Sequence, residues 1–239
     1  MSSCVNPPRR LLLGPGPSPV PPRVYEAMSR AITGLFDPYF SRLLEEHQDA
    51  LRRAFGTSNR FTTAVSGTGS AGMETCVSNL VEPGAKVAVF ANGFFCDRIT
   101  EMARRYGGQV ARLEKPWGEI FNENEAASFI EREQPRVVAF VHAETSTGAL
   151  QPPEAICAPA RKAGALVLAD CVTSLGAMPV RLDEVGIDAA YSCSQKGLGA
   201  PPGLSPVTFS DRALEHIRAR RAPNPNWYLD ARLLEEYFL

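Results

Sequence analysis

The chain has 239 residues, with 25 basic and 26 acidic side chains and a formal net charge of −1 at pH 7. This balance argues against a nucleic-acid-binding surface, and a hydrophobic share of 44% with 21% charged residues is that of an ordinary globular domain. No apolar run approaches the roughly 20 residues that span a bilayer, and the first residues lack the pattern of a secretory signal or an Arg-rich presequence. We therefore expect a soluble, cytoplasmic protein with no nucleic-acid or membrane partner.

The first sixty residues differ in pattern from the rest of the chain. A Pro- and Gly-rich extended stretch at residues 13–22 precedes two predicted amphipathic helices, residues 23–31 and residues 40–55. We expect residues 1–60 to form an N-terminal arm that packs either on the remaining domain or on a second subunit.

From residue 61 onward, β-branched apolar runs alternate with helix-patterned segments. The predicted strands are residues 62–65, 86–90, 109–113, 136–141, 165–169, 189–192 and 207–209. The first four strands are followed by predicted helices at residues 71–81, 96–105, 123–132 and 153–163. This alternation predicts an α/β domain over residues 61–239, with a mostly parallel central sheet flanked by helices. Right-handed crossovers would place the strand-to-helix loops at one sheet edge, where we expect the functional site.

Cysteine and histidine usage gives no sign of a metal site. The six cysteines include no C-x-x-C pair, so we expect buried free thiols in a reducing compartment. They are Cys4, Cys76, Cys96, Cys157, Cys171 and Cys193. The three histidines, His47, His142 and His216, lie far apart in the sequence, and we predict no bound metal.

A glycine-rich turn, SGTGSAG at residues 66–72, lies between the first predicted strand and the helix after it. A helix N-terminus presents free N–H groups and the positive end of the helix dipole, so Thr68, Gly69 and Ser70 are candidates for binding a phosphate. The glycines also fit the dinucleotide fingerprint G-x-G-x-x-G, but the next strand is followed by Ala-Asn-Gly rather than by the required acidic residue. A single phosphate is therefore favoured over NAD(P), and a turn without a ligand is a further alternative.

Further candidate side chains follow the other strands. Asp170 comes directly after a buried strand and needs a cationic or N–H partner there, although a helix cap or a local ion pair is an equal alternative. Lys196 lies among small, almost uncharged residues, and a desolvated lysine can form a Schiff base, although an isolated loop lysine is ordinarily solvated. Phe95 brings a ring that, taken alone, is more often a core residue. A phosphate cradle, a ring, a carboxylate and a lysine together predict pyridoxal phosphate.

Six segments resemble the class V pyridoxal-phosphate aminotransferases of fold type I, in the alanine–glyoxylate and serine–pyruvate or serine–glyoxylate branch. In the order found in that family, they are LLLGPGPSPVPPRV, SGTGSAGMET, ANGFF, HAETSTGALQP, LADCVTSLGAMP and SCSQKGLGAPPGLS. The resemblance implies a fold type I large domain that binds pyridoxal 5′-phosphate and forms a homodimer. It also implies ping-pong transfer of an amino group from alanine or serine to glyoxylate or another 2-oxo acid.

The resemblance implies a role for individual residues as well. Lys196 would form the Schiff base with the cofactor and then move a proton between the substrate and the cofactor, while Asp170 would keep the pyridinium nitrogen protonated. The other implied cofactor contacts are Thr68, Gly69, Ser70 and Gln195 at the phosphate, Phe95 and Val172 on the two ring faces, and Thr145 near the ring oxygen. Gly16 lies where members of that family approach the substrate.

The chain also departs from the family pattern. Cysteine desulfurase-like lyases of the same fold carry His where this chain has Gln195 and Phe95, which disfavours that alternative. Class V enzymes continue into a small C-terminal domain that supplies an arginine for the substrate carboxylate, whereas this chain stops within a predicted helix at residues 230–239. We therefore expect the small domain to be absent, which leaves an inactive or partial cofactor-binding fragment as an alternative.

Overall fold

The computed structural model describes residue 8 and residues 10–238, and in that part of the chain it contains a seven-stranded sheet. The strands are β1 (Phe61–Gly67), β2 (Lys86–Ala91), β3 (Gln109–Glu114), β4 (Val137–Val141), β5 (Leu166–Asp170), β6 (Ala189–Tyr191) and β7 (Gly203–Phe209). Their order across the sheet is β1-β7-β6-β5-β4-β2-β3. Every neighbouring pair from β6 to β3 is parallel, and β7 runs antiparallel to both β6 and β1. The sheet is thus mostly parallel, as the sequence predicts.

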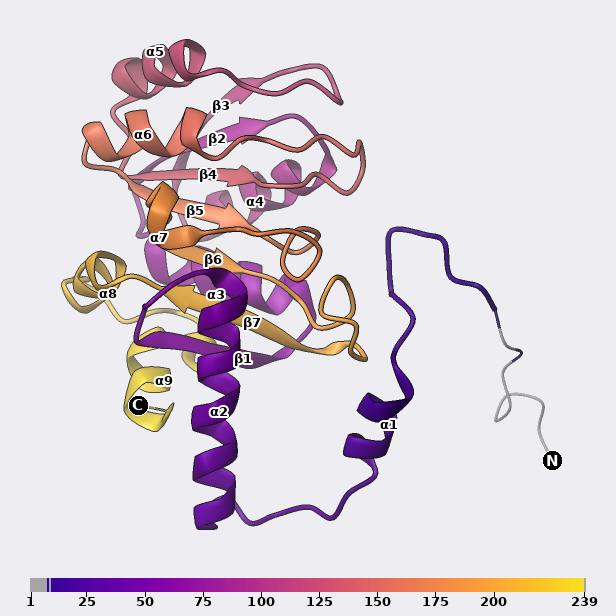
Figure 1. Cartoon of the computed structure of the whole chain (residues 1–239). Coiled ribbons are helices and arrows are strands. Elements are labelled where there is room, and N and C mark those ends of the chain that lie inside the picture. The colour runs from indigo at the N-terminus through magenta and orange to yellow at the C-terminus, as the bar shows by residue number, and fades with distance from the viewer. Residues whose placement is uncertain (1–7, 9, 239) are drawn as a thin grey trace.

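Helices cover both faces of this sheet (Figure 1). They are α1 (Pro22–Met28), α2 (Pro38–Phe55), α3 (Gly69–Leu80), α4 (Phe94–Arg105), α5 (Glu123–Glu133), α6 (Glu154–Lys162), α7 (Leu182–Val185), α8 (Asp211–Arg218), the 3-10 helix η2 (Trp227–Leu229) and α9 (Ala231–Phe238). Helices α3, α4 and α8 share one core with the sheet, and α5, α6, α7 and the end of α2 share the other. In β2, Val87 and Val89 belong to the first core, and Ala88 and Phe90 to the second, because successive side chains of a strand point to opposite faces.

Local sequence signals explain where the longer helices begin and end. Asp37 caps α2, since its side chain accepts a hydrogen bond from the Tyr39 amide at 2.8 Å, and Gly56 ends the helix in the left-handed conformation at φ 62°. At the start of α5, Asn122 and Glu125 form a reciprocal capping box. Across the described residues, no helix has the length and apolar content needed to cross a bilayer.

The predicted strands and helices are all present, with most ends shifted by a few residues. The largest shift is at β7, which begins at Gly203 rather than at the predicted residue 207. Pro206 lies in this stretch, and a proline inside an apolar run argues against a strand because it cannot donate to the ladder. In the structure Pro206 pairs with Ala64 of β1, and its carbonyl accepts from the Ser192 amide at 2.9 Å. The sequence did not predict the short helices α7, η2 and α8.

The predicted burial of the cysteines is confirmed for the described ones. Cys76, Cys96, Cys157, Cys171 and Cys193 are buried free thiols. Burial raises the pKa of the Cys96 thiol to about 12, so this thiol stays protonated and packs as a small apolar group. Cys4 lies outside the described residues.

The N-terminal arm stands away from the sheet over much of its length (Figure 1). Helix α1 buries none of its residues, and the side chains of Ile32 and Phe36 are 99% and 95% exposed. The arm nevertheless contacts the body before α1, where the Ser18 amide donates to the Gln195 carbonyl at 2.8 Å. After α1 it rejoins the body through α2, whose last residue, Phe55, is fully buried.

Candidate active site

The predicted site residues lie at the carboxyl ends of strands that run in the same direction. Since β7 is antiparallel to both of its neighbours, β1 points the same way as β6, and the loops after β1, β2, β4, β5 and β6 open on one sheet edge. The predicted residues along this edge are Thr68, Gly69 and Ser70 after β1, Phe95 after β2, Thr145 after β4, Asp170 and Val172 at the end of β5, and Gln195 and Lys196 after β6.

Asp170, the last residue of β5, is a buried carboxylate with an exposed fraction of only 2%. Its Oδ2 accepts a hydrogen bond from the Tyr191 hydroxyl at 2.6 Å, and its Oδ1 accepts one from the Val172 amide at 2.8 Å. Burial raises the pKa of Asp170 from its ordinary value of 3.8 to about 6; the two hydrogen bonds and the charge of Lys196 oppose this rise, and the charge of Glu144 adds to it. Within the described part of the chain Asp170 forms no ion pair, so its charge is available to a cationic ligand.

Lys196 is half-buried in the loop after β6, next to the N-terminal arm. Its Nζ donates a hydrogen bond to the carbonyl oxygen of Pro15. Gly16 has a φ of 127°, which favours glycine, and a Cβ atom on it would lie 2.7 Å from Lys196 Cδ, so the arm comes close to the lysine side chain. The bond from the Ser18 amide to the Gln195 carbonyl fixes the arm beside the lysine. Gly16, predicted near the substrate, therefore lies against the predicted catalytic lysine.

The N-terminal end of α3 faces the same group of loops. Thr68 precedes the helix with extended backbone, and its side chain makes no capping hydrogen bond. The first N–H groups of the helix are therefore able to bind an anion. A Cβ atom on Gly69 would lie 3.0 Å from Val172 Cγ2 and 3.4 Å from Cys193 Cβ, so the helix end packs directly against the loops after β5 and β6.

Gln195 carries an unsatisfied polar atom. Its Oε1 is buried and has no hydrogen-bond partner among the described residues. Because buried polar atoms are normally paired, this amide points to a ligand position beside Lys196. A half-turn of the amide exchanges its acceptor for two donors, so it can serve an anion as well.

Phe95 lies half-buried in the first turn of α4, with its ring edge-to-face against Phe94 at a centroid distance of 5.5 Å. The Arg98 guanidinium carbon lies 5.4 Å and 5.6 Å from the centroids of these two rings, and Arg98 donates to Ser70 Oγ at 3.5 Å. Arg98 therefore connects the predicted stacking ring to the predicted phosphate turn. The sequence analysis did not single it out, although residues three and four apart on a helix are neighbours.

Two buried residues that the sequence did not predict complete this edge. Tyr191 is fully buried and orients Asp170 through its hydroxyl. Glu144, 1% exposed, lies in the loop directly after β4, and it accepts from the Phe95 amide at 3.2 Å. Its position after an apolar strand was a usable signal, whereas nothing in the apolar run around Tyr191 indicates the partner of its hydroxyl. Thr145, which was predicted, hydrogen-bonds the Thr173 hydroxyl in the loop after β5.

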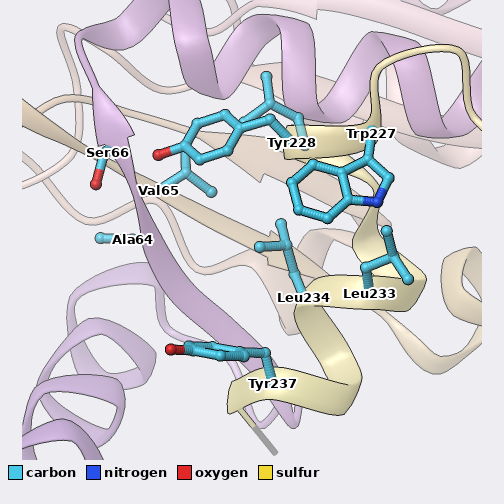
Figure 2. Close-up of a pocket in the computed structure, with 9 residues that line it drawn as sticks. Ala64, Val65, Ser66, Trp227, Tyr228, Leu233, Leu234 and Tyr237 are labelled. Atoms are coloured by element: carbon cyan, nitrogen blue, oxygen red, sulfur yellow. The ribbon is translucent and has the colours of Figure 1, made fainter. Parts of the chain in front are cut away.

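An apolar hollow of about 300 Å³ lies on the outer side of β1, between that strand and the segments η2 and α9 (Figure 2). Trp227, Tyr228, Leu234 and Tyr237 face it from the C-terminal segment. Its lining contains no acidic, basic or thiol group, so its chemistry does not indicate a reaction. The side chains suited to catalysis are those at the carboxyl edge of the sheet.

Comparison with known proteins shows which protein family the chain matches. The family model described as "Aminotransferase class-V" matches residues 10–222. The (S)-ureidoglycine–glyoxylate transaminase of Bacillus subtilis is 39% identical over 214 residues, which cover 90% of this chain and 51% of that protein. The alanine–glyoxylate aminotransferase of Oryctolagus cuniculus is 39% identical over 227 residues, which cover 95% of this chain and 58% of that protein.

A solved structure gives the same result. The crystal structure of the alanine–glyoxylate aminotransferase from Nostoc sp. matches this fold with a TM-score of 0.97 at 48% sequence identity, covering 100% of this chain and 63% of that one. The chain thus spans between 51% and 63% of the length of these three proteins.

Proposed function

The chain belongs to the class V aminotransferases, and from this membership we propose that it binds pyridoxal 5′-phosphate and moves an amino group from alanine or serine to glyoxylate or another 2-oxo acid. In the proposed ping-pong order, the amino donor leaves as its 2-oxo acid before the acceptor enters. One observation carries the proposal: the buried carboxylate of Asp170 ends β5 and the half-buried amine of Lys196 follows the neighbouring parallel strand β6, at the edge where α3 presents its N-terminus.

The side chains at this edge fit the groups of the cofactor. Asp170 suits a positively charged ring nitrogen, because its carboxylate is buried and forms no ion pair among the described residues. The N-terminus of α3 suits a phosphate, and the unpartnered amide of Gln195 suits the same group. Phe95 offers a ring face for stacking, and Lys196 offers the amine that a carbonyl cofactor requires.

Each residue then has a chemical task. Pyridoxal phosphate, when bound, supplies an electron-withdrawing ring that makes the α-proton of an amino acid acidic. Asp170 keeps the ring nitrogen protonated, and a cation at this carboxylate in turn favours its ionised form. Lys196 holds the cofactor and later takes and returns the proton at the substrate α-carbon. Thr145 would contact the ring oxygen, Val172 would pack on the second ring face, and Gly16 would lie where the substrate approaches.

The choice of substrates and the alternative functions are judged from the names of the relatives and from individual residues. The (S)-ureidoglycine–glyoxylate transaminase and the alanine–glyoxylate aminotransferase share glyoxylate in their names and differ in the amino donor, which supports glyoxylate as the acceptor. Gln195 and Phe95, which stand in place of His, disfavour a cysteine desulfurase-like lyase. NAD(P) would need an acidic residue after β2, where Asn92 and Gly93 stand. A partial or inactive cofactor-binding chain is the alternative that an activity assay decides.

The proposed assembly is a homodimer in which the arm, residues 1–60, packs against a second copy while residues 61–239 form the cofactor-binding domain. Leu13, Ile32 and Phe36 in the arm are 85%, 99% and 95% exposed, and a second copy packed on the arm would bury these apolar side chains. Sedimentation equilibrium should give twice the chain mass at micromolar concentration. A monomer at that concentration would contradict the dimer.

Cofactor binding tests the proposed function. The purified protein mixed with pyridoxal phosphate should develop a visible absorbance band that borohydride removes, and Lys196→Ala should lack this band. Lys162→Ala, at an exposed lysine that ends α6, is the control and should behave as the wild type. Alanine or serine should then abolish the band, and glyoxylate should restore it. A protein without any such band contradicts the cofactor, whereas a band that no amino acid alters supports an inactive chain.

A further inference from the structure

We propose that Glu144 and Ser146 are positioning residues, which clamp the loop after β4 onto the start of α4 and so hold Phe95 and Thr145 in place for the cofactor. This inference rests on the function proposed above for this edge. Neither Glu144 nor Ser146 has been assigned a contact with the cofactor. Their role follows from what they bind, and we call the pair the Glu144–Ser146 clamp.

The Glu144 carboxylate collects hydrogen bonds from two segments that are far apart in the sequence. Its Oε1 accepts from the Ser146 amide at 3.1 Å and from the Ser146 hydroxyl at 2.7 Å. Its Oε2 accepts from the Phe95 amide at 3.2 Å and from the Cys96 thiol at 3.7 Å. The side chain is buried, so water has little access to replace these donors if the carboxylate is removed.

Helix α4 depends on this clamp because it has no capping side chain of its own. Gly93 precedes the helix and provides none. Instead, Ser146 Oγ accepts from the Phe94 amide at 3.0 Å, and Glu144 accepts from the Phe95 amide. The first N–H groups of a helix need acceptors, and the positive end of its dipole favours a negative charge. A Cβ atom on Gly93 would lie 2.8 Å from Ser146 Oγ, so the two segments are in direct contact.

The clamp fixes two proposed cofactor contacts together. Phe95 takes its position from the first turn of α4, which Glu144 and Ser146 hold. Thr145 lies between the two clamp residues in the loop, and its hydrogen bond to Thr173 extends the connection to the loop after β5. Loss of the clamp should therefore loosen the stacking ring and the ring-oxygen contact at the same time.

Electrostatics indicate that Glu144 contributes through its hydrogen bonds. Its negative charge raises the pKa of Asp170, the carboxylate proposed to be ionised next to the ring nitrogen. A second buried carboxylate here thus works against ionisation of Asp170. The hydrogen bonds of Glu144 offset this electrostatic cost, because only an acceptor with two oxygens can make all of them.

Glutamine cannot replace Glu144 in this arrangement. One carboxylate oxygen accepts from the Ser146 amide and the other accepts from the Phe95 amide. Because glutamine has a single oxygen, either orientation of its side chain points an NH₂ group at a backbone N–H. Glu144→Gln should therefore release one side of the clamp, although the residue keeps its size.

Hydrogen exchange and cofactor affinity test the proposal on the purified protein. Without cofactor, Glu144→Gln should speed amide exchange in the first turn of α4 by about tenfold, equivalent to one lost charge-assisted hydrogen bond, and Ser146→Ala should speed it less. The Kd for pyridoxal phosphate should rise by a similar factor, and the visible circular dichroism of the bound cofactor should weaken. The matched control, Asp188→Asn, alters a buried carboxylate at the opposite sheet edge and should lower stability but keep the wild-type Kd.

The outcomes separate the clamp from the proposed function. Unchanged exchange in Glu144→Gln and Ser146→Ala would overturn the clamp, and faster exchange with an unchanged Kd would overturn its positioning role. If Glu144→Gln does not fold, Ser146→Ala decides by the same measurements, because its side chain is exposed. A wild-type protein that does not bind pyridoxal phosphate would contradict the proposed function and the cofactor role, and the exchange result would still decide the clamp.

Discussion

Two buried aspartates lie at opposite edges of the same sheet and have different surroundings. Asp188, just before β6, accepts a hydrogen bond from the Val167 amide at 2.9 Å and from the Ser210 hydroxyl at 2.9 Å. It also forms an ion pair with Arg212, whose Nε lies 2.9 Å from Asp188 Oδ1. The chain therefore neutralises this carboxylate itself.

At the carboxyl edge, the donors that Asp170 receives from the described residues are both neutral, the Tyr191 hydroxyl and the Val172 amide. Burial without an ion pair raises the pKa of Asp170 to about 6. The comparison teaches that the same residue type can stabilise the fold where the protein supplies its counter-charge, and that its charge stays available where the described residues supply none, as we propose for the ligand site at Asp170. Carboxylates with a shifted pKa are concentrated at functional sites for this reason.

The largest effect is expected for Asp188→Ala. This change leaves the Val167 amide without its acceptor and Arg212 without its counter-charge, and should lower the free energy of unfolding by about 3–4 kcal/mol. Urea unfolding of the cofactor-free protein measures this loss. Asp49→Ala, in an exposed ion pair with Arg52, is the control and should cost less than about 1 kcal/mol. An Asp188→Ala protein that folds but has lost its cofactor affinity would break the comparison.

Asp170→Asn should have the opposite effects. The cofactor-free variant should gain stability relative to the wild type as the pH rises, and its affinity for the cofactor should fall. The unfolded chain releases the Asp170 proton near pH 3.8 and the folded chain near about pH 6, so the folded state binds more protons between these values. The contribution of Asp170 to stability is therefore full below pH 3.8 and is lost as the pH rises through 6, by up to about 3 kcal/mol. Asparagine has no such proton, so the free energy of unfolding of the variant should rise relative to that of the wild type between these pH values. The variant should also bind the cofactor more weakly. Urea unfolding from pH 4 to pH 8 measures the difference, and a constant difference would contradict the assignment.

The sequence was sufficient to predict which candidate side chains the structure brings to one sheet edge. Asp170 and Lys196 come after apolar runs, and parallel strands bring such positions together. Partners that meet only through folding were not predictable. The Tyr191 hydroxyl reaches Asp170 across a separation of 21 residues, and Glu144 reaches Phe95 across 49. Chain order does not encode which of many polar groups a buried hydroxyl or carboxylate will meet.

Strand β7, which runs antiparallel to both of its neighbours, was also only partly predictable from the sequence. The parallel strands were predicted because each is a continuous apolar run that both helix layers cover. The first half of β7 was not predicted, because Pro206 interrupts the pattern and is tolerated only where a neighbouring group still uses its carbonyl, here the Ser192 amide. Helix α8 was too short to give a clear period, although Ala213, Leu214 and Ile217 bury one face of it.

Tyr191→Phe sharpens the comparison at Asp170 itself. The Tyr191 hydrogen bond lowers the pKa of Asp170, so its loss should cost most where this carboxylate is ionised. We expect a loss of about 2 kcal/mol in the free energy of unfolding at pH 8, the value of a hydrogen bond to a charged group, and a smaller loss at pH 4. Equal losses at both pH values would mean that the hydroxyl does not act on the charge of Asp170.

The smallest effect on stability is expected for Gly69→Ala. The added Cβ would lie 3.0 Å from Val172 Cγ2, so a slight shift is needed, and its cost of about 1 kcal/mol is partly offset because alanine restricts the unfolded chain. Cofactor affinity should fall more, by about fivefold, since Val172 and the phosphate turn move apart. Gly34→Ala, with no atom near its Cβ, is the control. Asp188→Ala should thus lower stability at constant Kd, and Gly69→Ala should raise Kd at nearly constant stability; variants in which both quantities change together would show that the two edges are not separate in function.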